Sequence, residues 1–297
     1  MEEVEVKKRG FFDNIFVLYI ESFILILLGQ ILGSVMVGMG YGVLSSFFPA
    51  IKESDAWITG TQYFMFIGIW VVALLWLLIK KNRPIYKTLW TSAKGNHLAG
   101  LFIGFVIGFV LNGSCILIAW LHKDIVLYLD AVRPLSLLVI FLCVFVQSSA
   151  EEFICRGFLY QRLLKSYGKP VIAIVGNSLL FALLHLGNEG VTILSVINIF
   201  LTGILMSFAV YYMDSLWCAM ALHTAWNFTQ NIIFGLPNSG MVMPYSIFKL
   251  DAATAMNSFA YNVGFGVEGT ILADVILMVA CLLFYFWGRK RIIIENV

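Results

Sequence analysis

The sequence predicts an all-α, polytopic membrane protein with about eight transmembrane helices. Of its 297 residues, 61% are hydrophobic and 12% are charged, and the mean hydropathy is +0.91. This composition lies far outside the range of soluble globular proteins. Several apolar runs also reach the roughly 17–25 residues that a helix needs to cross a bilayer.

Eight spans can be placed along the chain, with boundaries good to a few residues. We expect them near 15–38, 61–79, 98–120, 134–152, 170–187, 191–211, 215–234 and 269–287. No small-residue cleavage site closes the first apolar run, so we interpret it as a retained span. We expect one membrane domain in three parts: scaffold helices at 1–133, a catalytic core at 134–234, and a loop with the final span at 235–297.

The basic residues predict the orientation of the spans. When the connections are assigned to alternate sides, 15 of the 19 Lys and Arg residues fall on the side of the termini and four on the other. Cytosolic loops of membrane proteins carry the excess of basic residues. We therefore expect both termini in the cytosol. The five cysteines lie within apolar stretches and imply no disulfide framework.

Two connections are unusually long. The segment 235–268 is rich in Gly, Pro and aromatic residues and could form an external lid over a cavity, but we favour a mobile loop at the membrane interface. The segment 38–60 mixes aromatic and acidic residues and is sufficiently explained as an interfacial segment.

Two adjacent carboxylates and an arginine, Glu151, Glu152 and Arg156, follow the apolar run 135–150. On a helix, Glu152 and Arg156 lie at i and i+4, the favoured order for an ion pair, whereas Glu151 points about 100° away. One interpretation is a helix end that emerges into water, where such residues are ordinary. The other is a neutralised carboxylate beside a free one that faces a cavity, because charges at membrane depth are costly and usually functional.

Histidines and an amide on later spans supply further polar groups. Ser178, Phe181 and His185 share one helical face, and His223 and Asn227 lie one turn apart at i and i+4. The other two histidines lie near span ends. A single membrane histidine is more often bonded to a neighbouring helix than catalytic, so only the combination is informative.

Two further residues are interpreted as structural. Asn198 is expected to make an interhelical hydrogen bond rather than to support a site. Cys155 lies one turn from Glu151 and could in principle act as a nucleophile. We favour a small buried hydrophobic side chain, because nearby carboxylates raise the pKa of a thiol.

These groups permit hydrolysis without a nucleophilic side chain. A carboxylate and an imidazole can together activate a water, and an imidazole N–H with a carboxamide N–H can stabilise an oxyanion. Glu151, His185 and His223 could instead hold a divalent zinc ion. The residues alone leave both possibilities open, and we favour no obligatory metal. The His-Glu-x-x-His pattern of zinc proteases is missing.

Three motifs in order resemble the CPBP family. They are Glu-Glu-x-x-x-Arg at 151–156, Phe-x-x-x-His at 181–185 and His-x-x-x-Asn at 223–227. This family comprises type II CAAX prenyl proteases and the bacteriocin-processing and immunity-related Abi proteins. The resemblance covers about 130–230, and the N-terminal half carries no recognisable motif.

The resemblance implies a role for each motif residue. Glu151 and His185 would activate the water, His223 and Asn227 would stabilise the oxyanion, and Glu152 and Arg156 would support them. The expected function is then that of an intramembrane endopeptidase in the plasma membrane of a bacterium. Its expected partners are the lipid bilayer and a peptide or protein substrate, either lipid-modified or a bacteriocin or pheromone precursor; no nucleic acid is expected.

Two other functions stay open at this stage. A catalytically idle protein of the same fold could act in bacteriocin self-immunity or as a binding scaffold. The presence of all four polar residues argues against it. A transporter could use Glu151 as a proton-coupled carboxylate, but this does not explain the paired His223 and Asn227.

Overall fold

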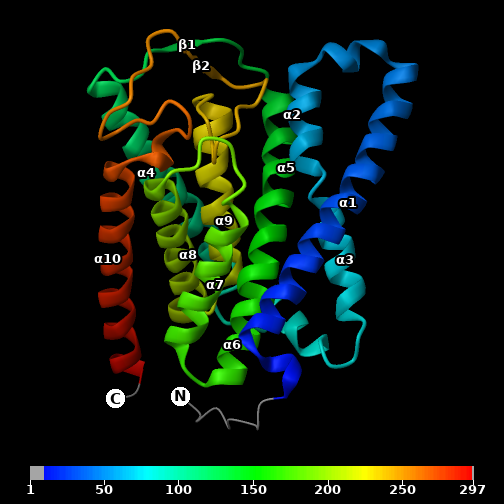
Figure 1. The fold of residues 1–297 in the computed structure, drawn as a ribbon, viewed down its shortest axis with the longest axis vertical. Helices are drawn as coiled ribbons and strands as arrows, with labels where there is room; N and C mark the ends of the chain where they lie inside the picture. Colours follow the sequence, from blue (N-terminus) through cyan, green and yellow to red (C-terminus); the bar gives the residue numbers. More distant parts are fainter. Residues whose placement is uncertain (1–9, 296–297) are drawn as a thin grey trace.

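The computed structural model describes residues 10–295 and contains ten α-helices in that range (Figure 1). They are α1 (Ile15–Phe47), α2 (Asp55–Phe64), α3 (Ile67–Leu77), α4 (Leu98–Leu121), α5 (Pro134–Glu152), α6 (Tyr160–Tyr167), α7 (Pro170–Leu184), α8 (Ile193–Met213), α9 (Leu216–Asn227) and α10 (Ile271–Glu295). Two short strands, β1 (Leu127–Leu129) and β2 (Phe248–Leu250), pair antiparallel, with Leu127 opposite Leu250.

The predicted all-α membrane fold is confirmed, and each of the eight expected spans corresponds to a helical segment. Six segments of the described chain are long and apolar enough to cross a membrane. The seventh, α7, is a shorter apolar helix of 15 residues. The eighth is α9, which continues directly into a π-helical segment, Phe228–Ile233.

Three span boundaries differ from the expectation. The first helix continues to Phe47 rather than ending near residue 38, because residues 39–47 contain no proline or charged residue. The second span consists of α2 and α3, with a break at Met65 and Phe66. The fourth runs without interruption from α5 through a π-helical segment, Phe153–Leu159, into α6.

Glycines bring helix backbones into direct contact at two places. A Cβ on Gly29 or Gly33 of α1 would collide with the backbone of Ile69 or Met65. On α4, a Cβ on Gly104 would meet a carbonyl of α9, and Gly108 is placed in the same way one turn later. Small residues at four-residue spacing allow such close packing in membranes. The second contact holds α9 at the centre of the bundle.

The two ends of the molecule differ in charge. Figure 1 shows that α1 begins and α10 ends at the same end, which we call the termini end, and that β1 and β2 lie at the opposite, strand end. Connections and helix ends of the described chain carry eleven basic residues at the termini end and four at the strand end. The first group is Lys80, Lys81, Arg83, Lys87, Lys94, Arg162, Lys165, Lys169, Arg289, Lys290 and Arg291; the second is Lys52, Lys123, Arg133 and Lys249.

One basic residue does not lie where the sequence predicts it. Arg156 is one of the 15 basic residues expected on the side of the termini, but it is fully buried inside the bundle, where it pairs with the buried Glu152. Lys7, Lys8 and Arg9 lie outside the described residues. The asymmetry between the two ends persists without these four residues.

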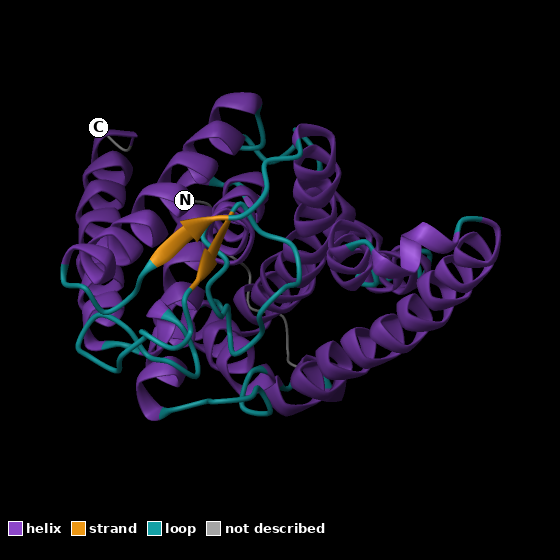
Figure 2. Cartoon of the chain, turned by 90° about the horizontal axis from the view of Figure 1, so that it is seen from above, coloured by secondary structure: helices purple, strands orange, loops and turns teal. Residues whose placement is uncertain are grey.

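The long connection before α10 is packed rather than loose. Tyr245, Tyr261 and Phe265 are almost completely buried, and the two strands lie over the helical bundle when it is seen from above (Figure 2). The amide of Asn231 donates to the carbonyls of Leu236 and Met241. The connection therefore forms a packed roof at the strand end, which fits a lid and corrects the expectation of a mobile loop.

Candidate active site

The π-helical segment after α5 places an ion pair in the middle of the bundle. Arg156 Nη1 donates to Glu152 Oε1 at 2.8 Å, and both side chains have 0% exposure. The second guanidinium nitrogen donates to the carbonyl of Gly203 on α8 at 3.2 Å. Short π-helical segments within α-helices often occur at functional sites. The predicted pairing of Glu152 with Arg156 is therefore present.

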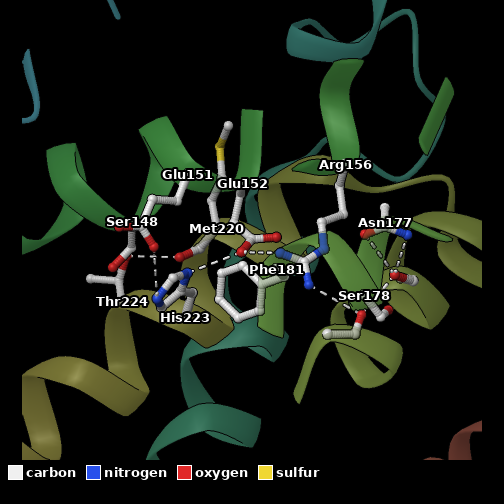
Figure 3. A network of polar contacts seen from close by, with 12 residues as sticks. Ser148, Glu151, Glu152, Arg156, Asn177, Ser178, Phe181, Met220, His223 and Thr224 are labelled. Atoms are coloured by element: carbon white, nitrogen blue, oxygen red, sulfur yellow. Dashed lines mark hydrogen bonds and ion pairs between the residues drawn. The ribbon is translucent and has the colours of Figure 1, made fainter. Parts of the chain in front are cut away.

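Glu152 has a second partner that the sequence did not suggest. Its Oε1 atom lies 3.0 Å from Nδ1 of His223, so the carboxylate lies between His223 and Arg156 (Figure 3). A carboxylate only accepts hydrogen bonds, which assigns a proton to Nδ1 of His223. The other ring nitrogen, Nε2, is left to face Glu151.

Glu151 is the free carboxylate of the pair. Its Oε2 atom is buried without a hydrogen-bond partner in the described structure, and its nearest ion-pair contact is Nε2 of His223 at 3.8 Å. This distance is too long for a hydrogen bond and is one that a single water can bridge. A buried carboxylate without a partner lowers the stability of the folded protein, so its presence indicates a functional role.

His185 lies at the C-terminal end of α7, where its own helix orients it. Its Nδ1 atom is 2.7 Å from the carbonyl oxygen of Phe181, which can only accept, so Nδ1 carries a proton. Because Nδ1 is engaged, Nε2 of neutral His185 keeps a lone pair. The Phe181 ring contacts both imidazoles edge-on, with centroid distances of 4.8 Å to His185 and 5.8 Å to His223.

Asn227 is held by two other amides. Its Nδ2 atom donates to Gln147 Oε1 at 3.0 Å, and its Oδ1 atom accepts from Asn238 Nδ2 at 3.2 Å. These two contacts fix the orientation of the carboxamide and leave one of its N–H groups free. Elsewhere in the bundle, Asn198 donates to Asp274 on α10 at 3.1 Å, the interhelical bond that was expected.

Sequence reasoning missed three residues of this region. Gln147 lies one turn before Glu151, and its polarity within an apolar run was an available signal. Asn238 and Glu268 belong to the roof, where no helical periodicity could reveal them. Glu268 accepts from Nε1 of Trp226 at 2.7 Å and from the backbone N–H of Ser239 at 2.6 Å. Burial raises the pKa of Glu268 above its ordinary value, although these hydrogen bonds oppose the shift.

All four predicted catalytic residues line one cavity of about 770 Å³. Its wall also includes Gln147, Asn238 and Glu268. Glu151 and His185 share this cavity, but no direct hydrogen bond joins them among the described contacts. A water between them would have to complete the predicted pair.

The proposed zinc ligands do not fit a metal site in this arrangement. Within residues 10–295, no group of three or more His, Cys, Asp and Glu side chains is arranged so that it could hold a metal ion. Because Nδ1 of His223 is engaged by Glu152, only Nε2 of this ring could bind a metal. We therefore derive no step through a metal.

One comparison with known proteins is informative. The family model described as type II CAAX prenyl endopeptidase Rce1-like matches residues 133–229, a segment that contains all four predicted catalytic positions. No curated protein and no solved structure matches the chain. Residues 133–229 therefore form an Rce1-like domain, which agrees with the resemblance to the CPBP family, and the six long apolar helices of the described chain indicate a multi-pass membrane protein.

Proposed function

We propose that this protein is an intramembrane endopeptidase in which Glu151 activates a water for attack on a peptide bond. The observation that carries the proposal is the buried, unpaired Oε2 atom of Glu151 at the wall of the cavity. A structural carboxylate in such a place would be expected to have a partner. A binding scaffold or a transporter would not explain why two anchored imidazoles and an anchored carboxamide line the same cavity.

The first step is the activation of water. Glu151 accepts a proton from the water, while the lone pair on Nε2 of His185 accepts a hydrogen bond from the remaining O–H and orients the nucleophile. The resulting hydroxide forms a C–O bond with the carbonyl carbon of the peptide. His185 is suited to this role because the Phe181 carbonyl fixes both its tautomer and its ring plane.

The second step is stabilisation of the oxyanion. The free N–H of Asn227 is one donor, and its orientation is set by Gln147 and Asn238. His223 can be the other donor only in its doubly protonated form, because its Nδ1 proton already binds Glu152. Glu152, whose Oε1 atom lies 3.0 Å from Nδ1, is the counter-ion of that form, because Glu151 has by then taken a proton from the water.

Bond cleavage then completes the reaction. The proton held by Glu151 passes to the leaving nitrogen as the C–N bond breaks, which releases an amine and a carboxylate. We propose that the substrate is a membrane-associated peptide or protein, either lipid-modified or a precursor of a secreted peptide. We also propose that the protein lies in a bacterial plasma membrane with both termini in the cytosol and needs no metal.

Trapping with hydroxylamine tests the mechanism. Direct attack by water should give only the carboxylate product, whereas an acyl-enzyme would transfer its acyl group to hydroxylamine and give a hydroxamate. Formation of hydroxamate, together with loss of activity in Cys155→Ser, would move the nucleophile to Cys155 and contradict the proposal. Absence of any cleavage by the native protein would favour the binding scaffold.

A further inference from the structure

The cavity is not symmetric between the two ends of the molecule. Besides helices, its wall includes two connections, residues 188–189 before α8 and residues 238–243 before α10. Both belong to the strand end (Figure 1). None of the described connections at the termini end, α3 to α4, α6 to α7 or α8 to α9, contributes a lining residue.

Toward the termini end, the helices close the bundle with a packed core. Leu163, Ala173, Leu216 and Ala219 are buried in one apolar cluster. These residues belong to α6 and to the first turns of α7 and α9, which all lie between the cavity and the termini end. A peptide could not enter from that side without separating these helices.

At the strand end, the cavity wall reaches the surface. Met241 and Val242 line the cavity and are 56% and 61% exposed. On the opposite wall, Phe23 and Leu27 of α1 also line the cavity and are 51% and 43% exposed. The mouth is therefore between α1 and the roof. Met241 and Val242 bound it at the strand end, whereas Phe23 and Leu27, in the first half of α1, bound it within the membrane span.

We infer that this cavity receives its substrate through the mouth between α1 and the roof and not from the termini end, and that the strand end is the extracytoplasmic face of the membrane. The second part follows from the eleven basic residues at the termini end against four at the strand end, because the cytosolic side carries the excess. If the proposed function holds, on which this step rests, the substrate is a peptide segment that is exposed outside the cytosol.

Cysteine accessibility tests the side directly. Met241→Cys places a thiol at the mouth, and Thr91→Cys places a matched thiol in the α3–α4 connection at the termini end, where Thr91 is exposed. The native cysteines are buried except for Cys143, which is half-buried. Cys143→Ser is therefore the common background, and the background alone gives the baseline of labelling.

Intact cells are treated with a membrane-impermeant maleimide before and after permeabilisation. We expect Met241→Cys to be labelled in intact cells to at least 80% of its level in permeabilised cells. Labelling of Thr91→Cys should be about tenfold higher in permeabilised cells than in intact cells. The reverse pattern would overturn the assignment of the face. Failure of Met241→Cys to react in intact cells would do the same.

The route of entry is tested on the purified protein. Each variant is assayed before and after reaction with a bulky maleimide, so that every variant is its own reference. Modified Met241→Cys should lose at least 80% of its turnover, and modified Thr91→Cys should keep its turnover. Unchanged turnover of modified Met241→Cys would overturn the route. If the native protein shows no turnover, the proposed function fails, while the labelling result still decides the face.

Discussion

Removal of Glu152 should destabilise the protein far more than removal of its neighbour Glu151. In Glu152→Ala, Arg156 would keep only the Gly203 carbonyl and the face of Phe181, at 4.5 Å from the ring centroid, as partners. Loss of one partner from a buried ion pair costs about 3–5 kcal/mol. Glu152→Ala also removes the hydrogen-bond acceptor of His223. This contact belongs to the same network, so the free-energy cost of its loss will not simply add to that of the ion pair.

Glu151→Ala is the matched control in the adjacent position. The carboxylate of Glu151 has a buried oxygen without a partner, and its contact with His223 is 3.8 Å long. Its removal should change the free energy of unfolding by less than about 1 kcal/mol, because no hydrogen bond is lost. An increase in stability is also consistent, since active-site groups are often kept at a cost in stability.

The assay is denaturant unfolding in detergent, followed by tryptophan fluorescence. Trp70 stacks on Phe153 of the π-helical segment at 5.2 Å and reports on the region of the ion pair. The double variant Glu152→Leu/Arg156→Met should recover most of the loss, because replacement of a whole buried pair is often neutral. Equal losses in Glu152→Ala and Glu151→Ala, or the reverse order, would refute the reasoning.

Four other predictions concern the reaction. Asn227→Ala and His223→Ala should each lower kcat by about 10²–10³ with little change in KM, as loss of one oxyanion donor does; a loss in KM alone would make Asn227 a substrate clamp. His185→Ala should be more severe, and near-normal turnover would refute its role in orienting the water. Chelators should leave turnover intact, and one zinc ion per chain that follows activity on metal analysis would contradict this. No Lys or Arg of the described chain lines the cavity, whereas Glu151, Glu189 and Glu268 do. A peptide with a free carboxylate within three residues of the cleaved bond should therefore have a KM about tenfold or more above that of its C-terminal amide. Equal KM values for the two peptides would contradict this.

The spans and the ion pair could be predicted because both depend on local sequence. Apolar runs of spanning length mark the helices, and i,i+4 spacing pairs Glu152 with Arg156. The break between α2 and α3 was not predictable, because it lies where Gly33 of α1 packs against Met65, a contact between distant parts of the chain. The long continuation from α5 into α6 was missed because Glu151 and Glu152 looked like a helix end.

The site was predictable in its members but not in all of its contacts. The motifs identify Glu151, His185, His223 and Asn227, and the structure brings all of them to one cavity. The hydrogen bond from His223 to Glu152 joins helices 71 residues apart in sequence, and helical spacing carries no information about such pairs. Asn238 reaches Asn227 from an irregular connection, so only the tertiary structure could identify it.

Hydrolysis that depends on Glu151 is the central claim, and turnover of the purified protein tests it most directly. The native protein and Glu151→Gln, which keeps the size of the side chain but cannot take a proton, are reconstituted in lipid vesicles with a quenched peptide library. We predict cleavage by the native protein and turnover at the level of empty vesicles for Glu151→Gln, with equal unfolding curves for both. Equal turnover of the two proteins would contradict the account.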